Sequence, residues 1–176
     1  MNEAAEGIRV LASVLTEQPL EGRLELMRQI SVGDERAAAF WEEHAGDDAG
    51  ASIALRVDWT RLFRGLSPAT GPRPPYEYLY APAADEMGAL LGIKLTYEAA
   101  GLTLGDEARN RPDYLGFELE FAAYLLETGN GAGDFAIKHL AWVPQFCAEA
   151  RRYAKTGFFA WYLDMVEACV REMYTQ

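Results

Sequence analysis

The chain has 176 residues, half of them hydrophobic, which is enough for one folded domain with a buried core and excludes general disorder. Its formal net charge of -11 at pH 7 argues against nucleic acid as a partner, because phosphates would be repelled. The same charge suits either a basic partner or simple solubility.

Apolar residues recur every three or four positions along most of the chain, which is typical of helices. In chain order this spacing predicts helices over about 8–15, 20–31, 37–43, 53–64, 85–100, 113–128, 145–154 and 158–173. Proline- or glycine-rich segments separate them, and two of these, 66–76 and 101–112, are long enough to act as hinges. We therefore predict an all-α single-domain helical bundle of about ten helices over 1–176. We expect a monomer, with a domain-swapped dimer as the alternative.

The predicted location is cytoplasmic. No apolar run approaches the roughly 18 residues that cross a bilayer, so we expect no stable membrane insertion. The N-terminus lacks the basic-then-apolar layout of a secretory signal. Cys147 and Cys169 stand outside any paired motif, so we expect reduced thiols rather than a disulfide framework.

The helix predicted over 113–128 carries one carboxyl group on its apolar face. At about 100° per residue, Glu118 lies in the middle of that face, whereas Glu120 and Glu127 lie on the opposite face. A lone buried carboxylate is costly unless it is neutral or has a partner. Glu118 is therefore either an architectural residue, bonded to backbone or a tyrosine, or part of a groove for a cationic ligand.

The helix predicted over 53–64 is apolar on two sides. Ile53 and Val57 lie on one side, and the other consists of four bulky residues: Leu55, Trp59, Leu62 and Phe63. Such a helix is either enclosed in the core or offers one side to a partner. Aromatic anchors of this kind are favoured at protein interfaces, so both interpretations stay open.

Catalytic and metal-binding motifs are absent from the sequence. His44 and His139 have no second metal ligand at helical spacing, and no Glu-x-x-His pair of a di-iron bundle occurs. Walker-type, GxGxxG and GxSxG motifs are also missing. Cys147 follows His139 along the chain, but this alone does not define a catalytic dyad. We predict a binding protein that is not an enzyme, with no metal and no cofactor.

Three blocks of sequence occur in an order that resembles a known family. They are WTRLFRG followed by PRPPYEYLY, then RPDYLGFELEF, then HLAWVPQF ahead of FFAWYLDM. In these blocks and the helices between them, about residues 50–170, the chain is similar to the TorD/DmsD/NarJ family of redox-enzyme maturation chaperones. The N-terminal third fits this family only as helices of suitable length.

The resemblance implies a system-specific chaperone for the precursor of a molybdenum-cofactor oxidoreductase, which assists cofactor insertion and delays export. The ligand would be the twin-arginine signal peptide, the enzyme body, or both. Carried over by position, the peptide-binding residues would be Trp59, Leu62, Phe63, Pro75, Tyr76, Tyr80, Asp113 and Tyr114. Tyr114 stands where the family commonly has histidine and Tyr78 where it often has serine, so the identity of the client stays open.

The residues agree with such a ligand. A twin-arginine leader has two guanidinium groups beside an apolar stretch, which suit carboxylates and an aromatic groove. Asp113 and Glu118 would supply the carboxylates, so Glu118 joins the predicted site. The alternatives are a NarJ-like assembly factor for an enzyme that is not exported, and a helical protein that binds molybdopterin or a nucleotide. The lack of a phosphate-cradling loop weighs against the last of these.

Overall fold

Helices make up the regular structure of this computed structural model, which describes residues 2–65, 67–81 and 85–175. Within those ranges no strand occurs, and an isolated antiparallel bridge joins Tyr76 to Tyr114. The α-helices of the described part are α1 (Glu3–Thr16), α2 (Leu24–Ile30), α3 (Glu35–Glu43), α4 (Asp48–Phe63), α5 (Glu77–Tyr80), α6 (Glu86–Ala99), α7 (Asp106–Asn110), α8 (Leu115–Thr128), α9 (Ala132–Phe135), α10 (Val143–Arg151) and α11 (Gly157–Met173). A 3₁₀ turn at Glu21–Arg23 and a π-helical turn at Ala136–Leu140 complete the order. The all-α prediction is confirmed.

The helices form two compact units. Unit 1 comprises the described parts of Met1–Thr16, Pro75–Gln145 and Cys169–Gln176, and unit 2 comprises those of Glu17–Pro74 and Phe146–Ala168. The single-domain organisation over 1–176 stays a prediction, as do the two hinges. Leu66, the first residue of the predicted 66–76 hinge, lies outside the described residues.

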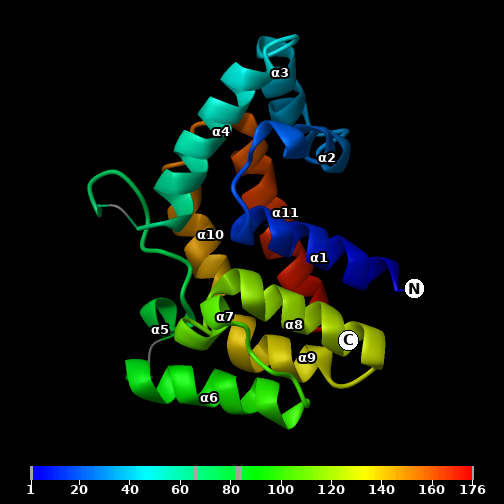
Figure 1. Ribbon diagram of the computed structural model, residues 1–176, viewed down its shortest axis with the longest axis vertical. Helices are drawn as coiled ribbons and strands as arrows, with labels where there is room; N and C mark the ends of the chain where they lie inside the picture. Colours follow the sequence, from blue (N-terminus) through cyan, green and yellow to red (C-terminus); the bar gives the residue numbers. More distant parts are fainter. Residues whose placement is uncertain (1, 66, 82–84, 176) are drawn as a thin grey trace. The chain divides into compact units, whose positions relative to one another are not determined.

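Unit 1 is built on the pairing of α1 with α8, which lie side by side along their length (Figure 1). The buried side of α1 repeats at helical spacing, with Ile8, Leu11 and Leu15 facing inward. On the surface, Arg9 forms an ion pair with Glu127. The sequence pattern predicted this inward face, and hydrophobic burial explains why these two distant segments meet.

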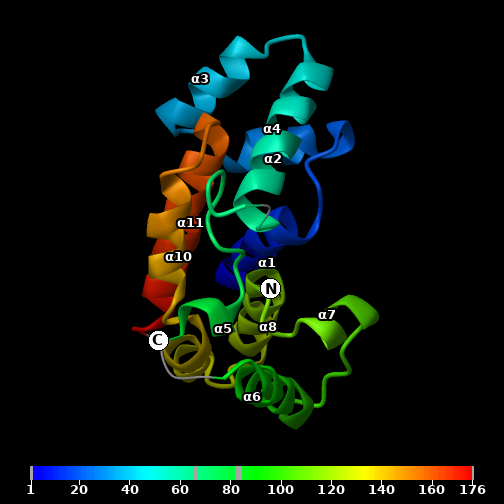
Figure 2. The same cartoon turned by 90° about the vertical axis from the view of Figure 1, so that its left-hand side faces the viewer.

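The core of unit 2 is aromatic. Phe63 of α4 contacts Phe146 of α10 and both Phe159 and Tyr162 of α11, with ring centroids 5.6–6.3 Å apart. The helices α10 and α11 lie next to each other in Figure 2, and Arg151 Nε donates to Asp164 Oδ1 at 2.6 Å between them. This cluster makes the FFAWYLDM block a structural element of unit 2.

Capping residues account for two helix ends, of which periodicity misplaced the first and predicted the second. The fourth helix begins at Asp48 and not near Ile53, because the Asp47 carboxylate accepts a hydrogen bond from the Gly50 amide at 2.9 Å. Helix α8 ends at Gly129, whose φ of 70° is the left-handed conformation that glycine adopts readily at a helix end. A capped helix such as α4 can therefore extend beyond the apolar stripe used to predict it.

Two further expectations can be compared with the described residues. Cys147 and Cys169 are both free thiols, as predicted. Among the described helices, none combines the length and the apolar character that crossing a bilayer requires.

Candidate functional site

Two segments that the sequence placed in one binding region meet in unit 1. The Glu77 amide donates to the Asp113 carbonyl, and the Leu115 amide donates to the Pro75 carbonyl, each at 3.0 Å. We call Pro75–Tyr80 together with Arg111–Glu118 the junction site. It brings together six of the nine predicted site residues: Pro75, Tyr76, Tyr80, Asp113, Tyr114 and Glu118.

Local sequence explains why these segments pair. Tyr76 is the residue before α5 and Tyr114 is the residue before α8, and both have extended backbones. Prolines precede both residues and disfavour helix, so the chain is extended on both sides of the isolated bridge. The Tyr114 hydroxyl then donates to the Leu15 carbonyl at 2.8 Å, which attaches the junction site to α1.

A guanidinium group lies in the junction site, that of Arg111. Its Nε and Nη2 donate to the two carboxylate oxygens of Asp113 at 3.1 and 2.9 Å, and its Nη1 donates to Glu86 at 3.0 Å. Its Cζ lies 4.0 Å from the Tyr76 ring centroid and 4.7 Å from that of Tyr78. Asp113 is fully buried, whereas the Arg111 side chain is 28% exposed. Burial raises the pKa of Asp113, although the positive charge of Arg111 acts in the opposite direction.

Glu118 is buried in the first turn of α8, as the helical spacing predicted, and Glu120 is exposed. Neither carboxyl oxygen of Glu118 has a hydrogen-bond partner among the described residues. Burial is the first cause that raises its pKa well above the ordinary value, followed by the negative charges of Glu77 and Asp113. The bond to backbone or a tyrosine that the architectural alternative requires is therefore not found among the described residues, and the Glu77 carboxyl and the Trp142 indole are further side chains that act on the pKa of Glu118.

Glu77 and His139 form a second buried contact of this region. The Nδ1 atom of His139 lies 3.2 Å from both carboxylate oxygens of Glu77, and its Nε2 lies 3.4 Å from the Thr96 hydroxyl. The Trp142 indole donates to the His139 carbonyl at 2.7 Å and its ring stacks on Tyr80. These contacts attach α5 to the π-helical turn and position Tyr80.

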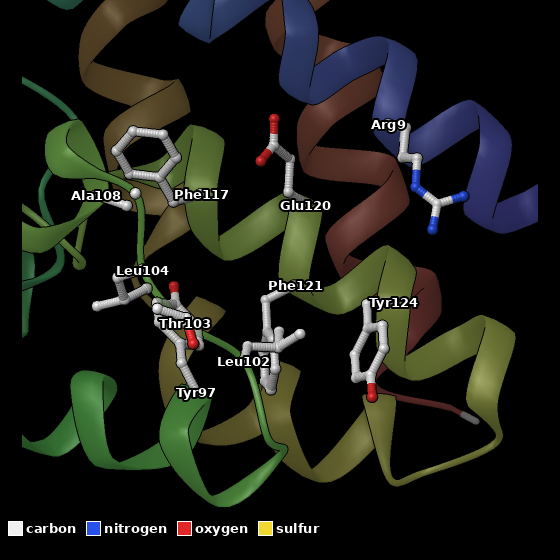
Figure 3. A pocket seen from close by; sticks show the side chains of 11 residues that line it. Arg9, Tyr97, Leu102, Thr103, Leu104, Ala108, Phe117, Glu120, Phe121 and Tyr124 are labelled. Carbon is white, nitrogen blue, oxygen red and sulfur yellow. The ribbon is translucent and has the colours of Figure 1, made fainter.

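A pocket of about 410 Å³ lies on α8 next to the junction site (Figure 3). Its walls come from α1, α6, α7, α8 and the loop after α6, with Tyr97, Leu102 and Phe121 gathered on one side and the charged Arg9 and Glu120 at the other. Phe117 belongs to both the pocket and the junction site, since its ring contacts Tyr114 at 5.6 Å. The pocket is thus largely aromatic and aliphatic, a lining that suits apolar side chains.

The other three predicted site residues belong to unit 2. Trp59, Leu62 and Phe63 are at most 1% exposed and lie in its core. The side of α4 that faces solvent is the other one, with Ile53 60% and Val57 54% exposed. The aromatic side of this helix is therefore enclosed in the core and is not offered to a partner. A contribution of these three residues to peptide binding stays a prediction.

Sequence reasoning missed the residues that hold the site together. Arg111 lies in the segment 101–112 that the sequence predicted as a hinge, where no side-chain pattern was expected, and Glu86 is distant in sequence. Asp58 in unit 2 was likewise missed: its carboxylate accepts hydrogen bonds from the Lys155 and Thr156 amides at 2.9 and 2.8 Å. A charged residue inside the apolar pattern of α4 was the available signal.

Metal binding finds no support in the part of the chain that is described. No group of three or more histidine, cysteine, aspartate or glutamate side chains there is arranged to hold a metal ion.

An all-α protein with a buried acidic junction is the class that this geometry defines. The family model described as nitrate reductase delta subunit matches residues 28–148, more than half of the chain. The chain therefore belongs to this family of NarJ- and TorD-like chaperones, whose members assist the maturation of molybdoenzymes. A search of curated proteins found no match.

Replacing Glu118 with glutamine should change how stability depends on pH. Folding raises the pKa of Glu118, so the neutral carboxyl favours the folded state at low pH, and this contribution is lost as pH rises through the raised pKa. The Glu118→Gln variant lacks that loss. Its free energy of unfolding should equal that of the wild type at about pH 5 and exceed it increasingly toward about pH 8, as measured by urea unfolding.

Glu120→Gln is the matched control on the same helix. Because Glu120 is exposed, its variant should stay within about 0.5 kcal/mol of the wild type at every pH. Glu77 and Asp113, whose negative charges raise the pKa of Glu118, are present in all three proteins. Identical pH profiles for the two variants would show that Glu118 does not titrate in a buried site.

Proposed function

We propose that this chain is a cytoplasmic, system-specific chaperone that binds the precursor of a molybdenum-cofactor oxidoreductase, assists cofactor insertion and delays export. The observation that carries the proposal is the family match over 28–148, a range that includes the whole junction site. The client segment that we propose is a twin-arginine leader, with the enzyme body as a further contact. The chaperone acts as a monomer, with the domain-swapped dimer as the alternative.

Two properties of unit 1 support a ligand with arginines beside an apolar stretch. The junction site already accommodates a guanidinium group between two tyrosine rings and two carboxylates. The neighbouring pocket has aromatic and aliphatic walls that suit the apolar stretch. The net charge of -11 favours the approach of a basic segment over longer distances.

Calorimetric titration with a synthetic twin-arginine leader tests this proposal. Asp113→Asn should weaken binding by roughly tenfold at every salt concentration, because Asp113 is fully buried and salt screens buried charges little. A leader with both arginines replaced by lysine should also bind more weakly, since lysine lacks the planar fork. Asp106→Asn, at a side chain that is 95% exposed, is the control and should bind like the wild type.

The matched family's description favours a second candidate, an assembly factor for a nitrate reductase-like enzyme that is not exported. The same titration separates the two. Binding of the leader supports the exported client. Absence of any binding heat at every salt concentration, together with binding of a leaderless enzyme body, would favour the second candidate and exclude the leader role.

A further inference from the structure

Arg111 occupies a complete recognition site for a guanidinium group. Arg111 makes two parallel hydrogen bonds to one carboxylate, one hydrogen bond to a second carboxylate, and contacts with two aromatic faces. These are the contacts that arginine makes in high-affinity sites. We call Tyr76, Tyr78, Glu86 and Asp113 the guanidinium cage. Its members come from the segment before α5, from α5, from α6 and from the segment before α8, so the fold itself assembles the cage.

Asp113 is the buried member of the cage, whereas Glu86 is 55% exposed and Tyr76 and Tyr78 are half-buried. Asp113 is fully buried, and the side chain that binds both of its carboxylate oxygens is the partly exposed Arg111. An arginine from outside can therefore make the same paired hydrogen bonds only when the Arg111 side chain leaves. The Arg111 backbone is held in place, because its carbonyl accepts a hydrogen bond from the Tyr114 amide at 3.2 Å. Release of the cage therefore involves the side chain.

Arg111 also leaves part of the acidity of this region uncompensated. Glu118 is fully buried in the same junction site, and neither of its carboxyl oxygens has a hydrogen-bond partner among the described residues. Its pKa is raised first by burial and then by Glu77 and Asp113. A second cation near the junction site would stabilise the ionised form of Glu118, which favours a ligand with more than one positive charge.

We propose that Arg111 closes the guanidinium cage in the free protein and that an arginine of the client displaces it from the cage. This inference rests on the proposed function, since it identifies the residues that bind the leader and the group that it displaces. Arg111 is an internal competitor tethered two residues from Asp113, so its local concentration is high. A single free arginine binds weakly, and a client arginine displaces Arg111 only when neighbouring apolar contacts hold the leader in place.

Chemical rescue tests the cage without any client. Arg111→Ala empties the cage and should lower the melting temperature, and methylguanidinium at millimolar concentration should restore part of the loss. Methylammonium, which has the same charge without the fork, should restore less. Arg109→Ala is the matched control, because Arg109 pairs with the exposed Asp106, and neither compound should affect its melting temperature selectively. Equal responses of the two variants to both compounds would overturn the cage.

Takeover by the client is tested with a peptide of two adjacent arginines followed by an apolar run. If Arg111 closes the cage at least nine-tenths of the time, Arg111→Ala should bind this peptide roughly tenfold more tightly than the wild type. A peptide with citrulline at both positions should show no such gain. Arg111→Lys is the second variant if the alanine variant does not fold, and should show a smaller gain because lysine is a weaker resident of the cage.

The outcomes separate this inference from the proposed function. Rescue by methylguanidinium without tighter peptide binding would make Arg111 a purely structural contact and overturn the takeover. If Arg111→Ala bound the citrulline peptide more tightly by the same factor as the arginine peptide, the takeover would also be overturned. Capture of a molybdoenzyme precursor by the wild type tests the chaperone role independently, and its failure would remove that role while the rescue experiment still decides whether the cage binds a guanidinium.

Discussion

Trp59→Ala is expected to lower the free energy of unfolding by about 3–5 kcal/mol, as measured by urea denaturation followed by circular dichroism. The side chain is 1% exposed, its ring contacts Phe63 at 6.3 Å, and Arg64 lies over its face at 4.6 Å. Removing it leaves a cavity that the surrounding rings of unit 2 can fill only in part. The loss reflects packing of the core and is independent of any peptide.

Val57→Ala on the same helix is the matched control. Because Val57 is 54% exposed, its loss should stay within about 0.5 kcal/mol. If Trp59→Ala unfolded no more easily than Val57→Ala but bound leader peptide poorly, Trp59 would be a surface anchor and its buried position would be wrong. Any binding measurement on Trp59→Ala therefore needs the melting curve of the same sample.

Asp58→Ala should cost about 3 kcal/mol of unfolding free energy in the same assay. Its buried carboxylate accepts from the Lys155 amide, from the Thr156 amide and from the Thr156 hydroxyl at 2.8–2.9 Å, and Arg61 donates to its other oxygen at 2.7 Å. The variant leaves these donors at the start of α11 without an acceptor. Helix α4 and the first turn of α11 should then separate more easily within unit 2.

Thr156→Val separates the hydroxyl from the rest of this contact. It removes one of the donors to Asp58 and the acceptor of the Phe159 amide at 3.3 Å, and it keeps both amide donors, so about 1–2 kcal/mol is expected. Asp106→Ala, at an exposed carboxylate, is the control for loss of a negative charge and should be nearly silent. Equal stability of Asp58→Ala and Asp106→Ala would contradict the structural role of Asp58.

Helical spacing predicted what depends on neighbours along the chain. It placed Glu118 inside and Glu120 outside, and it predicted the inward face of α1 that contains Ile8, Leu11 and Leu15. These positions follow because one side of an amphipathic helix must be buried. Helix α4 shows a limit of prediction from helical spacing. Its two sides are both apolar, so spacing alone does not decide which is enclosed.

The sequence predicted contacts between distant segments only in part. The proline segment and the RPD segment were assigned to one region from the resemblance, and the Tyr76–Tyr114 bridge joins them in the structure. The Arg111 contacts were not foreseen, because a pair two residues apart and a carboxylate from α6 leave no periodic signal. The short helices α5, α7 and α9 were also missed, since four or five residues contain too few turns to show a period.

Affinity capture from the source organism tests the chaperone role most directly. The tagged protein would be isolated from cytoplasm, and co-purifying proteins would be identified by mass spectrometry against a capture with an unrelated acidic protein. The account predicts the catalytic subunit of a molybdenum-cofactor oxidoreductase, retaining its twin-arginine leader and depleted of molybdenum relative to the mature enzyme. Enrichment of no molybdoenzyme over the control, or only of mature enzyme filled with cofactor, would contradict it.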